Sequence, residues 1–168
     1  MNPYGGIHFP GLGQKELFVW HTPFGGYLLD EKTSPTDSSS LSYLITGNPG
    51  QQVLKIQWKN AGFKQWYSTS DPADFADFQV GLYEDGARID VRFGPSSTDP
   101  GTYGYPGSIS DPNPGMSFKW WFDQCSNVLM PSGPANLPGY QFLNICNPNY
   151  AFLDGTPMSG ITYIINPE

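Results

Sequence analysis

The stretch FQVGLYEDGARIDVRF, residues 78–93, constrains the fold more than any other part of the chain. Two segments in which apolar residues alternate with other types flank an Asp-Gly pair, which is the sequence pattern of a β-hairpin. If Asp85 and Gly86 are the central residues of a type I′ turn, both need positive φ, which Gly accepts freely and Asp tolerates. The pattern therefore predicts two antiparallel strands joined by a two-residue turn.

The register of this hairpin follows by counting outward from the turn. One face then carries three apolar pairs, which are Leu82 opposite Ile89, Val80 opposite Val91 and Phe78 opposite Phe93. The other face carries Gln79 opposite Arg92, Gly81 opposite Asp90 and Tyr83 opposite Arg88. A slip of one residue would expose the whole apolar set, so the pattern predicts this register, with one face in the core and the other polar.

The composition favours strands and turns over helices. The chain has 168 residues, enough for one domain, of which 14% are charged and 15% aromatic, with 20 Gly and 17 Pro. No segment shows the periodicity of an amphipathic helix. We therefore expect an all-β protein that forms a single domain over residues 1–168.

Strand patterns recur along the chain with turn residues between them. They lie at 16–20, 26–29, 41–45, 52–60, 78–93, 117–122, 140–145 and 160–166. Within 52–60, Leu54, Ile56 and Trp58 alternate with Lys55, Gln57 and Lys59, which is typical of a half-buried strand. Short sequential strands with loops of unequal length predict an antiparallel two-sheet β-sandwich of jelly-roll type.

Charge and hydropathy bear on the classes of partner. The formal net charge is −7, and the 8 Lys and Arg residues are spread along the sequence without forming a cluster. This balance argues against a nucleic-acid partner. No apolar run is long enough to span a membrane, so we expect no membrane insertion. The N-terminal sequence has no signal-peptide pattern, and we expect any signal peptide to have been removed ahead of Met1.

Two cysteines, Cys125 and Cys146, allow one intramolecular disulfide. Such a bridge would stabilise the fold by about 3 kcal/mol by restricting the unfolded chain. The low charge and the many Asn, Gly and Pro residues favour an extracellular protein, in which the bridge would form. The alternative is two buried free thiols, and no further ligand lies beside them at a spacing typical of zinc.

Three segments together resemble a known family of domains. They are VLKIQWKNAGF, DFADFQVGLYEDGARIDVRFG and AFLDGTPMSGITYIINP. In this order they resemble a β-sandwich domain, similar to nidogen-type and concanavalin A-like jelly rolls, of secreted and surface proteins of Bacteroidetes that carry type IX secretion sorting domains. The resemblance covers about residues 40–168 and involves mostly core and turn residues, so it implies a fold and no catalytic residue. It also implies that the chain is one module of a longer protein.

Residue patterns for catalysis are weak. His8 and His21 belong to neither a Gly-x-Ser-x-Gly elbow nor a His-Glu-x-x-His zinc helix. Some concanavalin A-like sandwiches are glycoside hydrolases with two carboxylates at alternate positions of one strand. The nearest pair here, Glu84 and Asp85, is adjacent and lies at the turn, so a hydrolase is only a remote alternative. We expect no enzymatic activity and no catalytic residue.

Aromatic residues supply the best candidates for a ligand site. Flat aromatic rings stack on sugar rings at low entropic cost. Alternation in 117–122 places Phe118, Trp120 and Phe122 on one face, leaving Trp121 on the other. The candidates are Trp66, Tyr67 and Trp121, with Tyr103 and Tyr105 from the Pro- and Gly-rich loop at 94–115. The alternative is that these aromatics only pack within the protein.

Calcium is the candidate ion, because Asp71, Asp74 and Asp77 lie close together in SDPADFAD and Ca²⁺ binds oxygen ligands. The EF-hand pattern is absent, and Asp71 before Pro72 fits a turn or a helix cap equally well.

These observations predict a non-catalytic extracellular or cell-surface binding module of a bacterial protein. Adhesion or carbohydrate binding is its expected activity, with a glycan or a surface protein as partner. The alternative is a structural or protein-interaction spacer without a small ligand, in which the polar faces are simply solvated. The sequence leaves the oligomeric state open.

Overall fold

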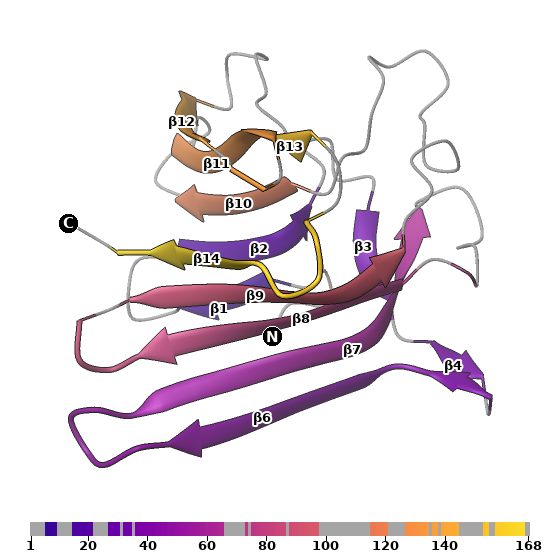
Figure 1. Ribbon diagram of the computed structural model, residues 1–168, viewed down its shortest axis with the longest axis horizontal. Helices are drawn as coiled ribbons and strands as arrows, with labels where there is room; N and C mark the ends of the chain where they lie inside the picture. Colours follow the sequence, from indigo (N-terminus) through magenta and orange to yellow (C-terminus); the bar gives the residue numbers. More distant parts are fainter. Residues whose placement is uncertain are drawn as a thin grey trace. The chain divides into compact units, whose positions relative to one another are not determined.

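The chain is all-β in the computed structural model shown in Figure 1. The structure describes residues 6–9, 15–21, 27–30, 32–34, 36–65, 73, 75–86, 88–97, 115–120, 127–134, 136–137, 139–144, 153–154 and 157–166. The regular elements in these ranges are all strands, which confirms the predicted class. Accordingly, no helix that could cross a membrane is found in this part of the chain.

The residues gather into two compact units. The first comprises Met1–Asp30, Phe63–Asp71 and Asp99–Thr156, and the second comprises Glu31–Gly62, Pro72–Thr98 and Pro157–Glu168. Each unit has its own sheet of described strands. The prediction of a single domain is not tested by this division and stays a prediction.

The second unit contains an antiparallel sheet of five strands in the order β14-β9-β8-β7-β6. These strands are β6 (Ser40–Thr46), β7 (Val53–Gln65), β8 (Phe75–Tyr83), β9 (Ile89–Ser97) and β14 (Thr162–Ile165). A small hairpin of β4 (Thr33–Ser34) and β5 (Asp37–Ser38) precedes β6. β3 (Tyr27–Asp30) is also a neighbour of β7, which itself continues into the first unit.

The hairpin of β8 and β9 has the register that the sequence predicts. Leu82 pairs with Ile89, Val80 with Val91, Phe78 with Phe93, Gln79 with Arg92 and Gly81 with Asp90. The predicted type I′ turn is wrong at Asp85, because Asn60 is the only non-glycine residue with positive φ in the described part of the chain. The hydrophobic pattern therefore determines the register without the turn geometry that we expected.

The core of the second unit lies against one face of its sheet. Trp58 stacks on Phe78 with ring centroids 4.7 Å apart, and the Phe93 ring meets Tyr163 edge-on at 5.3 Å. The buried apolar residues on this face are Ile56, Trp58, Phe78, Val80, Val91, Phe93 and Tyr163. Burial of each such side chain stabilises the fold by about 1.5–3 kcal/mol, so this face holds the unit together.

β7 extends five residues beyond the predicted end at Asn60, because a β-bulge lets it continue. Its pairing with β8 steps from Trp58 opposite Phe78 to Ala61 opposite Ala76, so Lys59 and Asn60 together oppose a single residue of β8. Asn60 has φ of 53°, a left-handed conformation that Asn tolerates better than most residues.

The turn between β6 and β7 depends on two glycines. Gly47 and Gly50 have φ of 98° and 84°, and Gln51 N donates a hydrogen bond to Asn48 O at 2.9 Å. A Cβ on Gly47 would collide with Gln51 O, whereas a Cβ on Gly50 would meet no atom within 4 Å. Any other residue would therefore have a strained backbone at both positions, but its Cβ would clash only at position 47.

Substitution of these glycines separates strain from collision. Gly50→Ala is expected to lower the free energy of unfolding by about 1 kcal/mol, because only the φ penalty applies. Gly47→Ala should cost roughly 1–3 kcal/mol more, because the clash with the carbonyl of Gln51 is added. Urea denaturation of both variants measures the difference, and equal losses would show that the turn relaxes without cost.

The first unit contains a sheet in the order β1-β2-β10-β11-β12, with β13 parallel to β11. Its strands are β1 (Gly6–Phe9), β2 (Lys15–His21), β10 (Gly115–Trp120), β11 (Asn127–Pro134), β12 (Gly139–Asn144) and β13 (Leu153–Asp154). Ile7, Leu17 and Val19 are buried. The sequence pattern did not predict β1 or β11, and β11 contains Pro131, a residue that argues against a strand.

Candidate functional site

The structure describes only one of the predicted site residues. Asp77, on β8, is half-buried, and its Oδ1 accepts a hydrogen bond from Asn60 N at 2.6 Å. No group of three or more His, Cys, Asp or Glu side chains that could hold a metal ion occurs among the described residues. The other predicted residues lie outside them, so these assignments stay predictions: Trp66, Tyr67, Asp71, Asp74, Tyr103, Tyr105, Trp121, Cys125 and Cys146.

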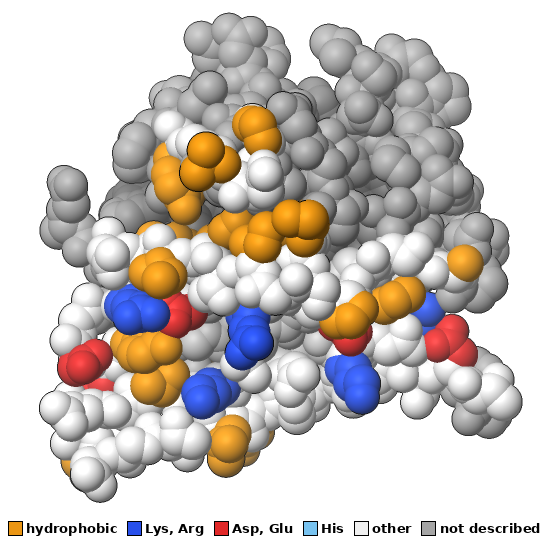
Figure 2. Space-filling view, in the orientation of Figure 1, with side chains coloured by type: hydrophobic (Ala, Val, Ile, Leu, Met, Phe, Trp, Pro, Cys, Tyr) orange, Lys and Arg blue, Asp and Glu red, His pale blue; other side chains and the backbone are white. Residues whose placement is uncertain are grey.

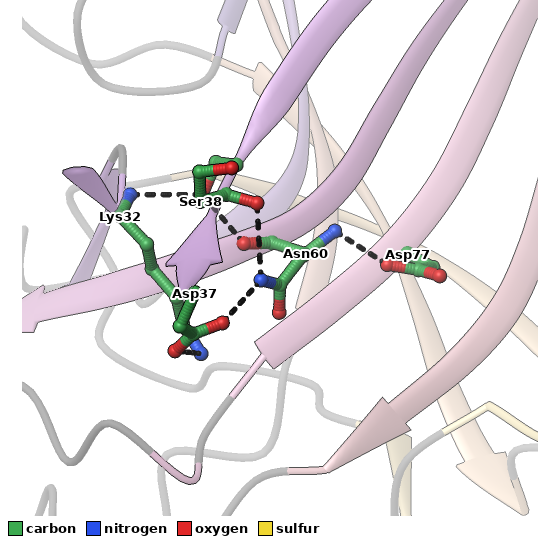
Figure 3. Close-up of polar contacts among 6 residues, drawn as sticks. Lys32, Asp37, Ser38, Asn60 and Asp77 are labelled. Atoms are coloured by element: carbon green, nitrogen blue, oxygen red, sulfur yellow. Dashed lines mark hydrogen bonds and ion pairs between the residues drawn. The ribbon is translucent and has the colours of Figure 1, made fainter. Parts of the chain in front are cut away.

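Asp77 belongs to a polar network around the bulge of β7, shown in Figure 3. Asn60 Nδ2 donates to Asp37 Oδ1 at 2.6 Å and to Ser38 O at 3.2 Å. Lys32 Nζ forms an ion pair with Asp37 Oδ2 at 3.2 Å. Hydrogen bonds from Asn60 and then Lys32 lower the pKa of Asp37 below its ordinary value. The network joins the β4–β5 hairpin to β7, so its polar groups bind one another and are not arranged for a ligand.

A second cluster lies at the turn end of β8 and β9. Arg88 binds both carboxylate oxygens of Asp90, with Nε to Oδ1 at 2.7 Å and Nη2 to Oδ2 at 2.8 Å. The Tyr83 hydroxyl also donates to Asp90 Oδ2 at 2.8 Å, and the Arg88 guanidinium lies 4.7 Å from the centroid of the Tyr83 ring. This is the bidentate geometry of a strong charge-assisted pair.

The cluster shifts the pKa values of its members. Burial raises the pKa of Asp90, but the hydrogen bonds from Arg88 and Tyr83 outweigh burial, so the pKa lies below its ordinary value. The hydrogen bond to Asp90 raises the pKa of Tyr83, and burial adds to the effect. Asp90 is therefore ionised and Tyr83 neutral near neutral pH.

The Asp90 cluster predicts that the stability of the fold decreases at acidic pH. Because the pKa of Asp90 is lower in the folded than in the unfolded protein, its ionised form stabilises the fold above the unfolded pKa, and this stabilisation is lost as pH falls through the folded pKa. Asp90→Asn should cost about 1 kcal/mol near pH 6 and less near pH 3. Urea unfolding at both pH values measures this. Asp85→Asn is the control, because Asp85 is exposed, and an equal change in both variants would contradict the prediction.

The polar face of the second unit's sheet carries a set of cations that the sequence analysis missed. Gln57 pairs with Gln79 and Gln79 with Arg92, so these three lie in line across β7, β8 and β9. Lys55 and Lys59 lie two residues to either side of Gln57 on the same face of β7. We call the set of Lys55, Gln57, Lys59, Gln79 and Arg92 the basic face. Figure 2 shows separate Lys and Arg side chains over this sheet, with Asp and Glu side chains beside some of them.

The cations of the basic face have no counter-ion among the residues that the structure describes. Lys55, Lys59 and Arg92 form no ion pair or hydrogen bond with any described residue. The acids on the same face, Asp77 and Asp90, accept hydrogen bonds from Asn60 and from the Arg88 cluster. Strand pairing thus places Arg92 on the same face of the sheet as Lys55 and Lys59, from which it is far apart in sequence.

The spacing of the basic face follows from sheet geometry. Strands lie about 4.8 Å apart and residues rise about 3.4 Å along each strand. The Cα atoms of Lys55 and Lys59 are therefore roughly 13 Å apart, and Arg92 lies two strands away, roughly 10 Å from Gln57. Lys59, Arg92 and Gln57 are exposed, while Lys55 and Gln79 are half-buried. Such an arrangement fits several anionic groups along an extended ligand better than one small anion.

Comparison with known proteins identifies the family. No curated protein matches the chain, and no solved structure matches it. A family model described as NIDO related matches residues 27–112, just over half of the 168 residues, and its span includes the whole of β7, β8 and β9. The match supports the nidogen-like part of the predicted resemblance. The chain belongs to the NIDO-related family.

Proposed function

We propose that this protein is a non-catalytic extracellular module that binds anionic glycans through its basic face. NIDO-related domains are typically extracellular, which supports this setting. The observation that carries the proposal is the set of three cations, Lys55, Lys59 and Arg92, on one face of a chain whose net charge is −7, none of which has an ion-pair partner among the described residues. Adhesion to a polysaccharide of a cell surface or matrix is the corresponding biological role.

The chemistry of the basic face suits a carboxylated or sulfated sugar chain. Lysine ammonium groups act as point charges, and the Arg92 guanidinium presents a planar set of donors to an oxyanion. Gln57 and Gln79 lie between the cations and offer amide groups, which donate to and accept from sugar hydroxyls. Both acids of this face bind protein groups, which supports a binding role over a catalytic one.

The fold that we propose for this module is the two-sheet antiparallel sandwich of jelly-roll type. The five-stranded sheet of the second unit supports it, because a sheet with one buried apolar face needs a second layer over that face. A secreted bacterial protein of Bacteroidetes carrying a sorting domain remains the parent that the sequence resemblance implies.

Binding to a sulfated polysaccharide tests the proposed function. We expect heparin to bind at low salt more tightly than neutral dextran, with an affinity that falls as salt rises. Lys55→Gln with Lys59→Gln should weaken heparin binding roughly tenfold, at about 0.7 kcal/mol for each lysine charge. Isothermal titration calorimetry measures the dissociation constants.

The control keeps the change in net charge the same. Lys15→Gln with Lys119→Gln also removes two lysines, at β2 and β10 of the first unit, and should leave heparin binding within about twofold of wild type. Equal losses in the two double variants would show that binding follows net charge alone. Absence of heparin binding at low salt would reject the proposal outright.

A further inference from the structure

The outer strand of the second unit's sheet, β6, is unusually apolar for an edge that is open to solvent. Leu41, Tyr43, Leu44 and Ile45 have 50%, 73%, 59% and 54% of their surface exposed. β6 pairs with β7 over all seven of its residues without a bulge, and it contains no charged residue and no proline. Figure 1 shows β6 at the border of this sheet.

Open sheet edges in proteins are usually protected against pairing. Charged side chains, prolines, bulges and short strands serve this purpose. At the opposite edge, β14 has only four residues, and Pro167 follows it closely in the sequence. β6 has none of these protections, so its open edge can form backbone hydrogen bonds with a further strand.

The direction of the free backbone groups of β6 follows from the hydrogen bonds of its neighbours. Glu84 N donates to Gln52 O at 2.9 Å, so even-numbered residues of β7 bond towards β8 and odd-numbered ones towards β6. The partners of those odd-numbered residues in β6 are Ser40, Ser42, Leu44 and Thr46. Leu41, Tyr43 and Ile45 therefore direct their N–H and C=O groups away from β7, towards the open edge.

We propose that β6 pairs antiparallel with β6 of a second copy of this chain, with a two-fold axis at Tyr43. In this register Tyr43 faces Tyr43 of the second copy, and Leu41 faces Ile45. Each of these facing pairs exchanges two hydrogen bonds, because the residues concerned carry the outward N–H and C=O groups. The exposed apolar side chains of the same residues then pack across the new strand pair.

A second copy fits this edge because β6 is complementary to itself. On the opposite face of the strand, Ser42 faces Leu44 of the second copy. β6 contains no charged residue, so no like charges oppose each other in this pairing. A two-fold contact covers the open β6 edge of both copies at once and closes the assembly at a dimer, which prevents further growth through this edge.

The dimer would also affect the basic face, a consequence that rests on the proposed function. Residues facing each other in an antiparallel pair project their side chains from the same side of the sheet. The two basic faces would therefore lie on one side of a continuous sheet. A long anionic chain could bind both at once, with higher avidity than either alone.

A charge exchange at position 43 tests the register. Sedimentation velocity should show a concentration-dependent dimer of the wild-type protein. Tyr43→Lys and Tyr43→Glu, each alone, should raise the dimer dissociation constant at least tenfold, because each places like charges opposite each other at the two-fold axis. An equimolar mixture of the two variants should recover the dimer, because the charges then attract.

Two further variants separate this edge from a general effect on folding. Leu44→Lys introduces a charge on the same strand opposite Ser42 and should leave the dimer within about threefold of wild type. Tyr43→Pro removes one outward N–H without removing a β6–β7 bond. It should yield a monomer by sedimentation velocity that is folded by circular dichroism.

A wild-type protein that is monomeric at all concentrations would overturn the proposal. Dimers that survive every Tyr43 substitution, or a mixture without recovery, would overturn it as well. None of these three results changes the outcome expected of the heparin experiment.

Discussion

Phe78→Ala is expected to lower the free energy of unfolding by about 3–5 kcal/mol. The side chain is 2% exposed, stacks on Trp58 at 4.7 Å with an interplanar angle of 12°, and faces Phe93 on β9. Truncation removes the transfer free energy of the ring and leaves a cavity between two aromatic neighbours that the rigid strands cannot close. Urea denaturation followed by circular dichroism measures the loss.

The adjacent residue supplies the control for Phe78→Ala. Gln79 lies on the same strand but on the polar face, and Gln79→Ala should change the free energy of unfolding by less than about 1 kcal/mol. Phe78→Leu should fall between the two, because it keeps part of the buried apolar volume. Similar losses for Phe78→Ala and Gln79→Ala would contradict the assignment of the core to one face.

The hairpin of β8 and β9 could be predicted residue by residue because its sequence permits one register only. A slip of one residue would move Phe78, Val80 and Leu82 to the solvent face at a cost that no turn can offset. The turn itself was predicted less well. Asp85 was assigned positive φ from the Asp-Gly pattern, yet the strands keep their register without it.

The extension of β7 was missed because its cause is a tertiary contact. The alternation in residues 52–60 ends at Lys59, and the strand continues only because Asn60 takes the extra position of a bulge opposite Asp77. A local pattern of apolar residues contains no information about that partner. The strand β11 was missed for a local reason. It contains Pro131, and a proline within a short apolar segment argues against a strand.

The basic face was present in the sequence as two separate halves. Alternation places Lys55, Gln57 and Lys59 on one side of their strand, and the hairpin register places Gln79 and Arg92 on one side of theirs. The missing step was the order of strands, because only the pairing of β7 with β8 makes the two halves neighbours. Strand order depends on long-range packing, which a single sequence does not display. The aromatic, aspartate and cysteine candidates outside the described residues stay predictions.

Asn60→Val is expected to destabilise the second unit by about 2–3 kcal/mol. Asn60 has φ of 53°, and a β-branched side chain is strongly disfavoured in this left-handed conformation. The substitution also removes the hydrogen bonds from Nδ2 to Asp37 and Ser38, which hold the β4–β5 hairpin against the bulge. Urea unfolding measures the total effect.

Two other substitutions at the same position divide that effect between conformation and hydrogen bonding. Asn60→Gly keeps the left-handed conformation without strain and loses only the side-chain bonds, so it should cost less than half as much as valine. Asn60→Asp tolerates the same φ but places a carboxylate where Nδ2 lies 2.6 Å from Asp37 Oδ1, and should therefore be less stable than glycine near neutral pH. If valine and glycine prove equally destabilising, the hydrogen bonds alone select asparagine. If glycine instead matches the wild type, the bulge requires the backbone conformation and the network around Asp37 follows from it.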